Sequence, residues 1–66
     1  MLYFQKGDEV TFISKNKESR YYGQECIGRV MQRLSNVCMV VPYYSGHEEL
    51  YYASDLRLVD RDSNRA

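Results

Sequence analysis

"CIGRVMQRLSNVCMVVPY", residues 26–43, is the longest β-rich part of this 66-residue chain. Two runs rich in apolar and β-branched residues, 26–34 and 37–43, flank a Ser-Asn pair, which favours a tight turn. The stretch therefore predicts an antiparallel hairpin. Its register stays open, because a loop of two residues and a loop of three send opposite sets of side chains to the core. Pro42 has no N–H to donate to a strand ladder, so it should end the second strand of this hairpin, the third strand of the chain, or lie at its edge.

Shorter β-like segments lie on both sides of this hairpin. Before it, residues 9–14 follow a Gly-Asp turn and contain Val, Thr, Phe and Ile, which suit a half-buried strand, and the polar residues 15–25 should form the longest loop. After it, "SGHEE" predicts a turn, residues 49–52 a short fourth strand, and residues 53–59 one turn followed by a fifth strand. Five short strands without a helical layer predict an all-β domain, built as a small closed or nearly closed barrel.

The length fits one domain, which we place at residues 1–59 and follow with a polar tail at 60–66 that we expect to be disordered. Apolar residues make up 44% of the chain, enough for a folded globule. The sequence shows neither an apolar run that could span a bilayer nor a signal-peptide pattern, so we expect a soluble, cytoplasmic protein without membrane contact. Cys26 and Cys38 lie in apolar runs and should be reduced packing residues.

Three further stretches have a characteristic order: "KGDEV" before the first strand, "GQECIGRV" with a glycine two places before a valine, and the closing "YYASDLRLV". Together they resemble the small SH3-like (Src-homology-3-like) barrels, particularly the KOW and Tudor branches. The resemblance covers residues 5–59 and implies a five-stranded SH3-like barrel with a single helical turn, "ASDL", before the last strand. Such barrels commonly bind through the loop that joins the first two strands and through neighbouring turns. The chain has no basic excess and no tryptophan, so the resemblance implies the fold rather than one function.

Tyrosine doublets lie in three places. The first is in the predicted loop 15–25, the second is at the end of the hairpin, just before the "SGHEE" turn, and the third is in the fourth strand. In the strand, alternation puts Leu50 and Tyr52 on one face and Tyr51 on the other, so Tyr51 is exposed if Leu50 is in the core. Exposed tyrosines combine a large contact area with a hydroxyl group and are typical of protein interfaces. We therefore predict a protein-binding surface made of Tyr21, Tyr22, Tyr43, Tyr44 and Tyr51, with at least two exposed rings.

Two other interpretations of the tyrosines stay open. A chain with two phenylalanines and no tryptophan can use tyrosine as its core aromatic, with the hydroxyl at the rim. Alternatively, three or four rings could surround the cation of a methylated lysine.

Nucleic acid is the alternative partner, because aromatic rings can stack on unpaired bases while basic side chains contact phosphates. The candidate contacts are Lys15, Lys17, Arg20, Arg29 and Arg33. However, nine basic and nine acidic side chains cancel, and Glu18 and Glu25 lie in the same segment as the first three. This balance argues against an unspecific grip on DNA or RNA.

No motif for catalysis or metal binding accompanies these residues. His47 is the only histidine, it lies in a predicted turn, and neither cysteine has a metal-ligand spacing. A Cys–His dyad would need an exposed thiol beside a pocket. We expect no metal, no cofactor and no enzymatic activity. The sequence thus predicts a non-enzymatic binding module, an adaptor or inhibitor of another protein, as a monomer or small homo-oligomer; the alternative is a KOW-like nucleic-acid-binding module.

Overall fold

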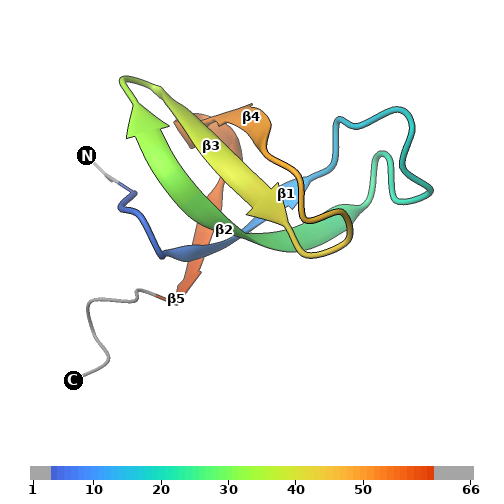
Figure 1. The fold of residues 1–66 in the computed structure, drawn as a ribbon, viewed down its shortest axis with the longest axis horizontal. Coiled ribbons are helices and arrows are strands. Elements are labelled where there is room, and N and C mark those ends of the chain that lie inside the picture. Colours follow the sequence, from blue (N-terminus) through green and yellow to red (C-terminus); the bar gives the residue numbers. More distant parts are fainter. Residues whose placement is uncertain (1–3, 61–66) are drawn as a thin grey trace.

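The computed structural model describes residues 4–60, which form one antiparallel sheet of five strands (Figure 1). The elements are β1 (Glu9–Ile13), β2 (Glu25–Leu34), β3 (Val37–Pro42), β4 (Glu49–Tyr52), the 3-10 turn η1 (Ala53–Asp55) and β5 (Arg57–Asp60). The spatial order is β4-β3-β2-β1-β5, so successive strands are neighbours until β5 returns to β1. The predicted all-β class is confirmed. No element between residues 4 and 60 is a helix that could cross a membrane.

The strand positions follow the prediction closely. The fourth strand has the predicted bounds. Each of the first three strands differs from its predicted range by a single residue, at one of its two ends. The fifth strand includes Asp60, one residue beyond the predicted domain limit. The rest of the predicted tail, residues 61–66, lies outside the described residues.

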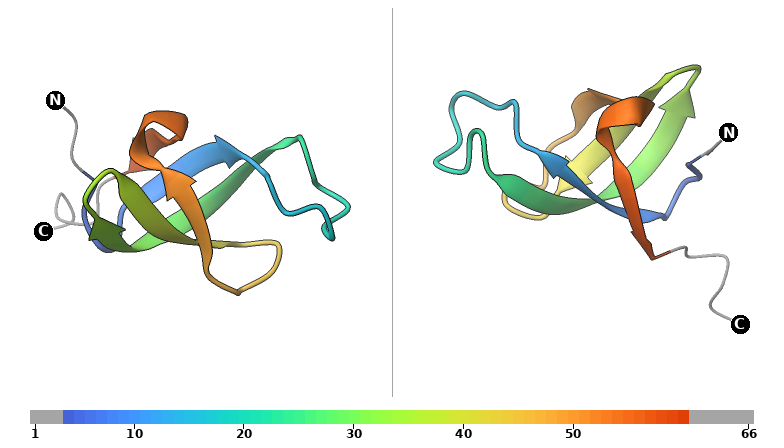
Figure 2. Two further views of the ribbon diagram at one scale, coloured as in Figure 1. Left: turned by 90° about the horizontal axis from the view of Figure 1, so that it is seen from above. Right: turned by 180° about the vertical axis from the view of Figure 1, so that it is seen from behind.

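The sheet has two edges, β4 and β5, which do not pair with each other. From β4 at one edge, the chain passes through η1 and crosses one face of the sheet to reach β1 near the other edge (Figure 2). The space between the sheet and this crossing segment holds the core. The five strands and the single turn before the last one are as predicted, whereas closure into a barrel is not confirmed.

The register of the β2–β3 hairpin, which the sequence leaves open, is fixed by a loop of two residues, Ser35 and Asn36. Val30 lies opposite Val40, and both side chains are fully buried, which defines the core face of the sheet. Met31 then follows as an extra residue in β2, where the pairing shifts by one. Such a bulge bends the strand and increases its twist, which helps the sheet to curve around its core.

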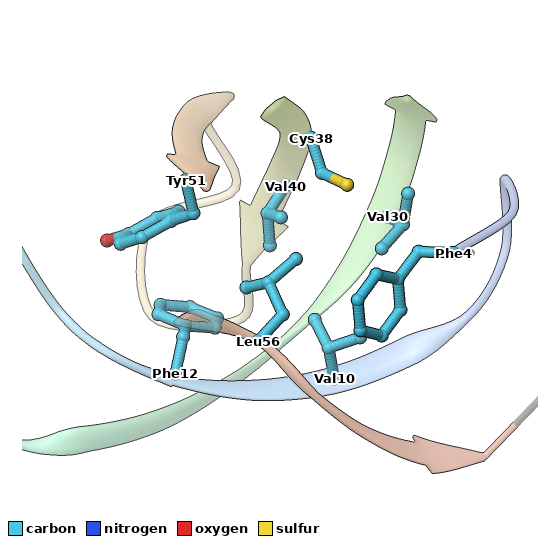
Figure 3. Close-up of a cluster of buried hydrophobic side chains, with 8 residues drawn as sticks. All are labelled: Phe4, Val10, Phe12, Val30, Cys38, Val40, Tyr51 and Leu56. Atoms are coloured by element: carbon cyan, nitrogen blue, oxygen red, sulfur yellow. The ribbon is translucent and has the colours of Figure 1, made fainter. Parts of the chain in front are cut away.

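Eight buried side chains form the hydrophobic core (Figure 3). They are Phe4, Val10, Phe12, Val30, Cys38, Val40, Tyr51 and Leu56. Phe4 and Leu56 come from outside the strands; Leu56 lies in the middle of the cluster and Phe4 at one side of it, beside Val10. Cys38 is part of this core and Cys26 packs against it; both are free thiols, as predicted. Burial raises the pKa of both thiols, so both are protonated at neutral pH.

The third tyrosine doublet alternates as expected, but in the opposite sense to the predicted exposure of Tyr51. Tyr51 lies opposite Cys38 on the core face and is 2% exposed, whereas Leu50 is 62% exposed. The Tyr51 ring packs on Phe12 with the centroids 4.6 Å apart. Its hydroxyl group reaches the rim of the core, where it donates a hydrogen bond to Glu49. Because the larger apolar surface is buried and the hydroxyl keeps a partner, Tyr51 takes the core position and is no surface residue.

Candidate binding groove

The long loop between β1 and β2, residues 14–24, is closed at its base by backbone hydrogen bonds. The N–H of Ser14 donates to the carbonyl of Gln24 at 3.0 Å, and the N–H of Gly23 donates back to the carbonyl of Ser14 at 2.9 Å. Gly23 has a φ of 79°, a conformation that glycine adopts without steric cost. Within the loop, the N–H of Tyr22 donates to the carbonyl of Ser19. The loop therefore follows a defined path and places Tyr21 just before its closing turn.

A shallow groove of about 380 Å³ lies between this loop, β2 and the start of the β3–β4 turn. Its lining residues are Thr11, Tyr21, Glu25, Cys26, Ile27, Tyr43 and Tyr44. The rings of Tyr21 and Tyr44 pack against each other with their centroids 5.7 Å apart and a tilt of 32°. We call this site the tyrosine groove. Its surface is mainly aromatic and aliphatic; the polar groups of its lining side chains are the Glu25 carboxylate, the Cys26 thiol and the hydroxyl groups of Thr11 and the tyrosines.

Tyr43 lies across the sheet surface and is held there by its hydroxyl group. Arg29 Nη2 donates to the Tyr43 hydroxyl oxygen at 3.0 Å, and the hydroxyl donates to Glu9 Oε2 at 3.1 Å. Arg29 Nη1 also donates to the carbonyl of Gly7 at 2.6 Å, which fixes the guanidinium itself. The Tyr43 side chain is 53% exposed, so these contacts orient a ring that remains open to solvent.

Tyr44 is held from the other side by the carboxylate of Glu49. The Tyr44 hydroxyl donates to Glu49 Oε1 at 2.8 Å and lies 3.0 Å from Oε2, and the Ser14 hydroxyl lies 2.8 Å from the Tyr44 oxygen. Tyr51 donates to Glu49 Oε1 at 2.7 Å, and Asn16 Nδ2 donates to Oε2 at 3.0 Å. One carboxylate thus accepts hydrogen bonds from the loop, the β3–β4 turn and β4.

The tyrosine hydroxyls of this network keep their protons at neutral pH. Burial raises the pKa of Tyr44 above its ordinary value, and the acceptor Glu49 adds to that rise. Burial likewise raises the pKa of Tyr51 far above its ordinary value. Both hydroxyls are therefore neutral donors toward the Glu49 carboxylate.

The structure divides the five predicted tyrosines into three groups. Tyr21, Tyr43 and Tyr44 line the tyrosine groove. Tyr22 is 51% exposed but does not line it, and Tyr51 belongs to the core. The expectation of at least two exposed rings is confirmed.

Four lining residues were not predicted as site residues: Thr11, Glu25, Cys26 and Ile27. Thr11 and Ile27 are paired across β1 and β2 on the face opposite the core. Strand alternation could have placed them on that face, but only with the register of β2 known. The sequence predicts Glu25 as the last residue of the loop, whereas it begins β2 and lies at the groove.

The two arginines predicted as nucleic-acid contacts on β2 lie on opposite faces of the sheet. Arg29 pairs with Val41 and Arg33 with Cys38, and these partners are three residues apart in a regular strand. Arg33 Nη1 donates to the carbonyl of Ser35 at the hairpin turn.

The remaining predicted basic contacts belong to the long loop. Lys15 Nζ lies 3.0 Å from Asp55 Oδ2 in an exposed ion pair. Lys17 and Arg20 are exposed, and the Arg20 guanidinium lies 5.5 Å from the centroid of the Tyr21 ring. Because Lys15 is paired and the arginines of β2 diverge, the five side chains do not form one continuous basic face.

Residues 4–60 contain no group of three or more His, Cys, Asp or Glu side chains that could hold a metal ion. His47 is exposed in the β3–β4 turn, where its backbone N–H donates to Ser45 Oγ at 3.1 Å. The absence of metal, cofactor and catalysis stays a prediction.

Comparison with protein-family models, with curated proteins and with solved structures gave no match. The resemblance to SH3-like barrels therefore stays a prediction.

Proposed function

We propose that the protein is a non-enzymatic binding module, an adaptor or inhibitor that holds a segment of another protein in the tyrosine groove. The observation that carries this proposal is the packed pair of Tyr21 and Tyr44 beside the exposed ring of Tyr43. Tyrosines supply large contact areas at a small cost in rotamer entropy, and they are enriched among residues that dominate binding energy.

Preorganisation supports this function. Arg29 and Glu9 hold the Tyr43 hydroxyl, and Glu49 holds the Tyr44 hydroxyl. Rings that are already oriented lose less conformational entropy when a partner binds, so more of the contact energy appears as affinity. A surface meant only for solvent would not need these fixed rings.

The charge of the groove favours a partner segment with a basic residue beside an apolar one. Glu25 is the only charged residue among those that line the groove. It makes no side-chain hydrogen bond or ion pair with the described residues. A lysine or arginine of the partner could lay its aliphatic stem on the rings and pair with Glu25.

The fold and place of action are proposed on separate grounds. The strand order, with η1 before β5, supports membership of the SH3-like class, because the first four strands follow one another and the fifth returns to the first. The free thiols of Cys26 and Cys38 suit a reducing compartment such as the cytoplasm.

The test is capture of a partner by the immobilised protein from its native lysate, with and without nuclease. Tyr21→Ala and Tyr43→Ala should weaken binding by about 2 kcal/mol, roughly 30-fold in Kd, because each removes an oriented ring. Tyr52→Ala is the matched control, since Tyr52 is 55% exposed and does not line the groove.

Equal capture by all three variants would exclude the groove as the binding site. Capture that nuclease abolishes and that falls steeply with salt would support the nucleic-acid alternative instead. Circular dichroism of each variant shows whether the sheet is intact.

A further inference from the structure

The carboxylate of Glu49 connects segments that are far apart in the sequence. Asn16 from the long loop, Tyr44 from the β3–β4 turn and Tyr51 from β4 all donate hydrogen bonds to it, at 2.7–3.0 Å. The described part of the chain places no ion-pair partner on this carboxylate; the neighbouring Lys15 is paired with Asp55. Neutral donors therefore stabilise the Glu49 charge.

Tyr44 and Tyr51 depend on this carboxylate to different degrees. The Tyr51 ring is 2% exposed and packs on Phe12, so the core holds it in place. The Tyr44 ring is only half-buried, and its position follows from its contact with Tyr21 and from the bonds of its hydroxyl group to Glu49 and Ser14. Loss of the carboxylate should release Tyr44 and leave Tyr51 where it is.

We propose that Glu49 is a positioning residue for the tyrosine groove: its carboxylate fixes the Tyr44 ring against Tyr21 and so sets one wall of the groove. This inference rests on the proposed function, which makes that wall part of a binding site. It adds that the first residue of the edge strand β4, which does not line the groove, controls the shape of the groove.

The same bonds tie the groove to the base of the long loop. Ser14 Oγ is bonded to the Tyr44 hydroxyl and accepts from the N–H of Asn16, while the N–H of Lys15 donates to the Tyr51 hydroxyl. The start of the loop is thus held by the groups that Glu49 organises. Near its end, Tyr21 packs on Tyr44. Release of Tyr44 would therefore free the wall of the groove and the Tyr21 ring, while the backbone bonds of Ser14 with Gln24 and Gly23 would still close the base of the loop.

The experiment compares two ring contacts by NMR in protein with ¹³C-labelled aromatic rings. The Tyr21–Tyr44 contact reports on the groove, and the Phe12–Tyr51 contact reports on the core. In Glu49→Ala, the nuclear Overhauser effect (NOE) between Tyr21 and Tyr44 should fall by more than half, because three donors lose their acceptor, while the core contact persists. Glu49→Gln keeps one acceptor oxygen and should retain much of the groove contact. Glu48→Ala is the matched control, since its side chain is exposed and outside the network.

A second variant keeps the test decisive if Glu49→Ala loses both contacts through unfolding. Tyr44→Phe removes only the hydroxyl group, and it should also lose the contact with Tyr21. An unchanged Tyr21–Tyr44 NOE in folded Glu49→Ala, or in Tyr44→Phe, would overturn the proposal. These measurements need no partner, so they decide the role of Glu49 even if the wild-type protein captures nothing. If a partner is captured, its binding should weaken in Glu49→Ala and remain in Glu48→Ala.

Discussion

Ser35, at the first position of the β2–β3 turn, has a φ of 60° and is the only non-glycine residue with positive φ between residues 4 and 60. A positive φ at the first loop position alone is the pattern of a type II′ turn, in which glycine is preferred there. The side chain of Ser35 therefore imposes a local strain on the hairpin that organises the whole sheet.

Replacing this serine should relieve the strain. We expect Ser35→Gly to raise the free energy of unfolding by about 0.5–1 kcal/mol, because the relief of a left-handed conformation exceeds the added chain entropy of glycine. Urea unfolding followed by circular dichroism measures the change. Asn36→Gly is the control: its position has no positive φ, so it should bring no gain. A loss of stability in Ser35→Gly would contradict this account of the turn.

At the scale of elements, local patterns predicted most of the structure. Turn chemistry at Ser35-Asn36 and the run of β-branched residues located the hairpin, and the turn residues before it located the start of β4. The faces could not be predicted, because the extra residue Met31 shifts the pairing and depends on how the strand bends around the core. Hydrophobicity alone favoured Leu50 over Tyr51 for the core, whereas the contact of Tyr51 with Phe12 joins residues that are far apart in the sequence.

The tyrosines of the candidate site could be predicted from the sequence, whereas the strand residues beside them could not. Tyr21, Tyr22, Tyr43 and Tyr44 were expected at one binding surface because they lie at loops through which SH3-like barrels commonly bind; of these four, Tyr22 does not line the groove. Ile27 and Glu25 were missed because the register and the start of β2 decide where they lie. Closure of the sheet was not predictable either, since it depends on the distance between β4 and β5, strands that meet no common neighbour.

Gly28 allows β2 to lie close beside its neighbour β3 in the sheet. A Cβ atom there would lie 2.8 Å from the carbonyl oxygen of Val41 and 3.0 Å from the Cα of Pro42, both backbone atoms. We expect Gly28→Ala to lower the free energy of unfolding by about 2–3 kcal/mol, because the strands must separate to admit the methyl group.

Gly23→Ala is an informative comparison for this prediction. Gly23 has a φ of 79° and open space around it, so alanine there should cost only conformational strain, about 1 kcal/mol. Thermal unfolding of both variants measures the difference. If Gly28→Ala were as stable as Gly23→Ala, the strands would not be packed as closely as described.

At the scale of the whole molecule, the hydroxyl network links stability to pH. The pKa values of Tyr44 and Tyr51 are raised in the folded protein, chiefly by burial. Above the ordinary tyrosine pKa of about 10, the unfolded chain releases these protons while the folded protein keeps them. The folded state then binds more protons than the unfolded state, so stability falls as the pH rises. Below about pH 10 this contribution to stability is fully present.

We therefore expect the urea midpoint to fall between about pH 10 and pH 12, and to fall less steeply in Tyr51→Phe. The comparison with this variant separates the effect from lysine titration, which both proteins share. The slope for each tyrosine has an upper limit of about 1.4 kcal/mol per pH unit. Equal slopes in the two proteins would show that Tyr51 does not carry the linkage.

Phe4, the first residue that the structure describes, is 2% exposed in the core, and Leu56 near the other end is 5% exposed. In addition, β1 pairs with β5, so the last strand completes the sheet around the first. During synthesis, a chain of this topology cannot complete its core until Leu56 has left the ribosome, and it cannot complete its sheet until β5 follows. Until then, β1 has only β2 as a neighbour and its other edge is bare. The domain therefore cannot complete its sheet until β5 has been translated, and until then the bare edge of β1 is open to pairing with other strands.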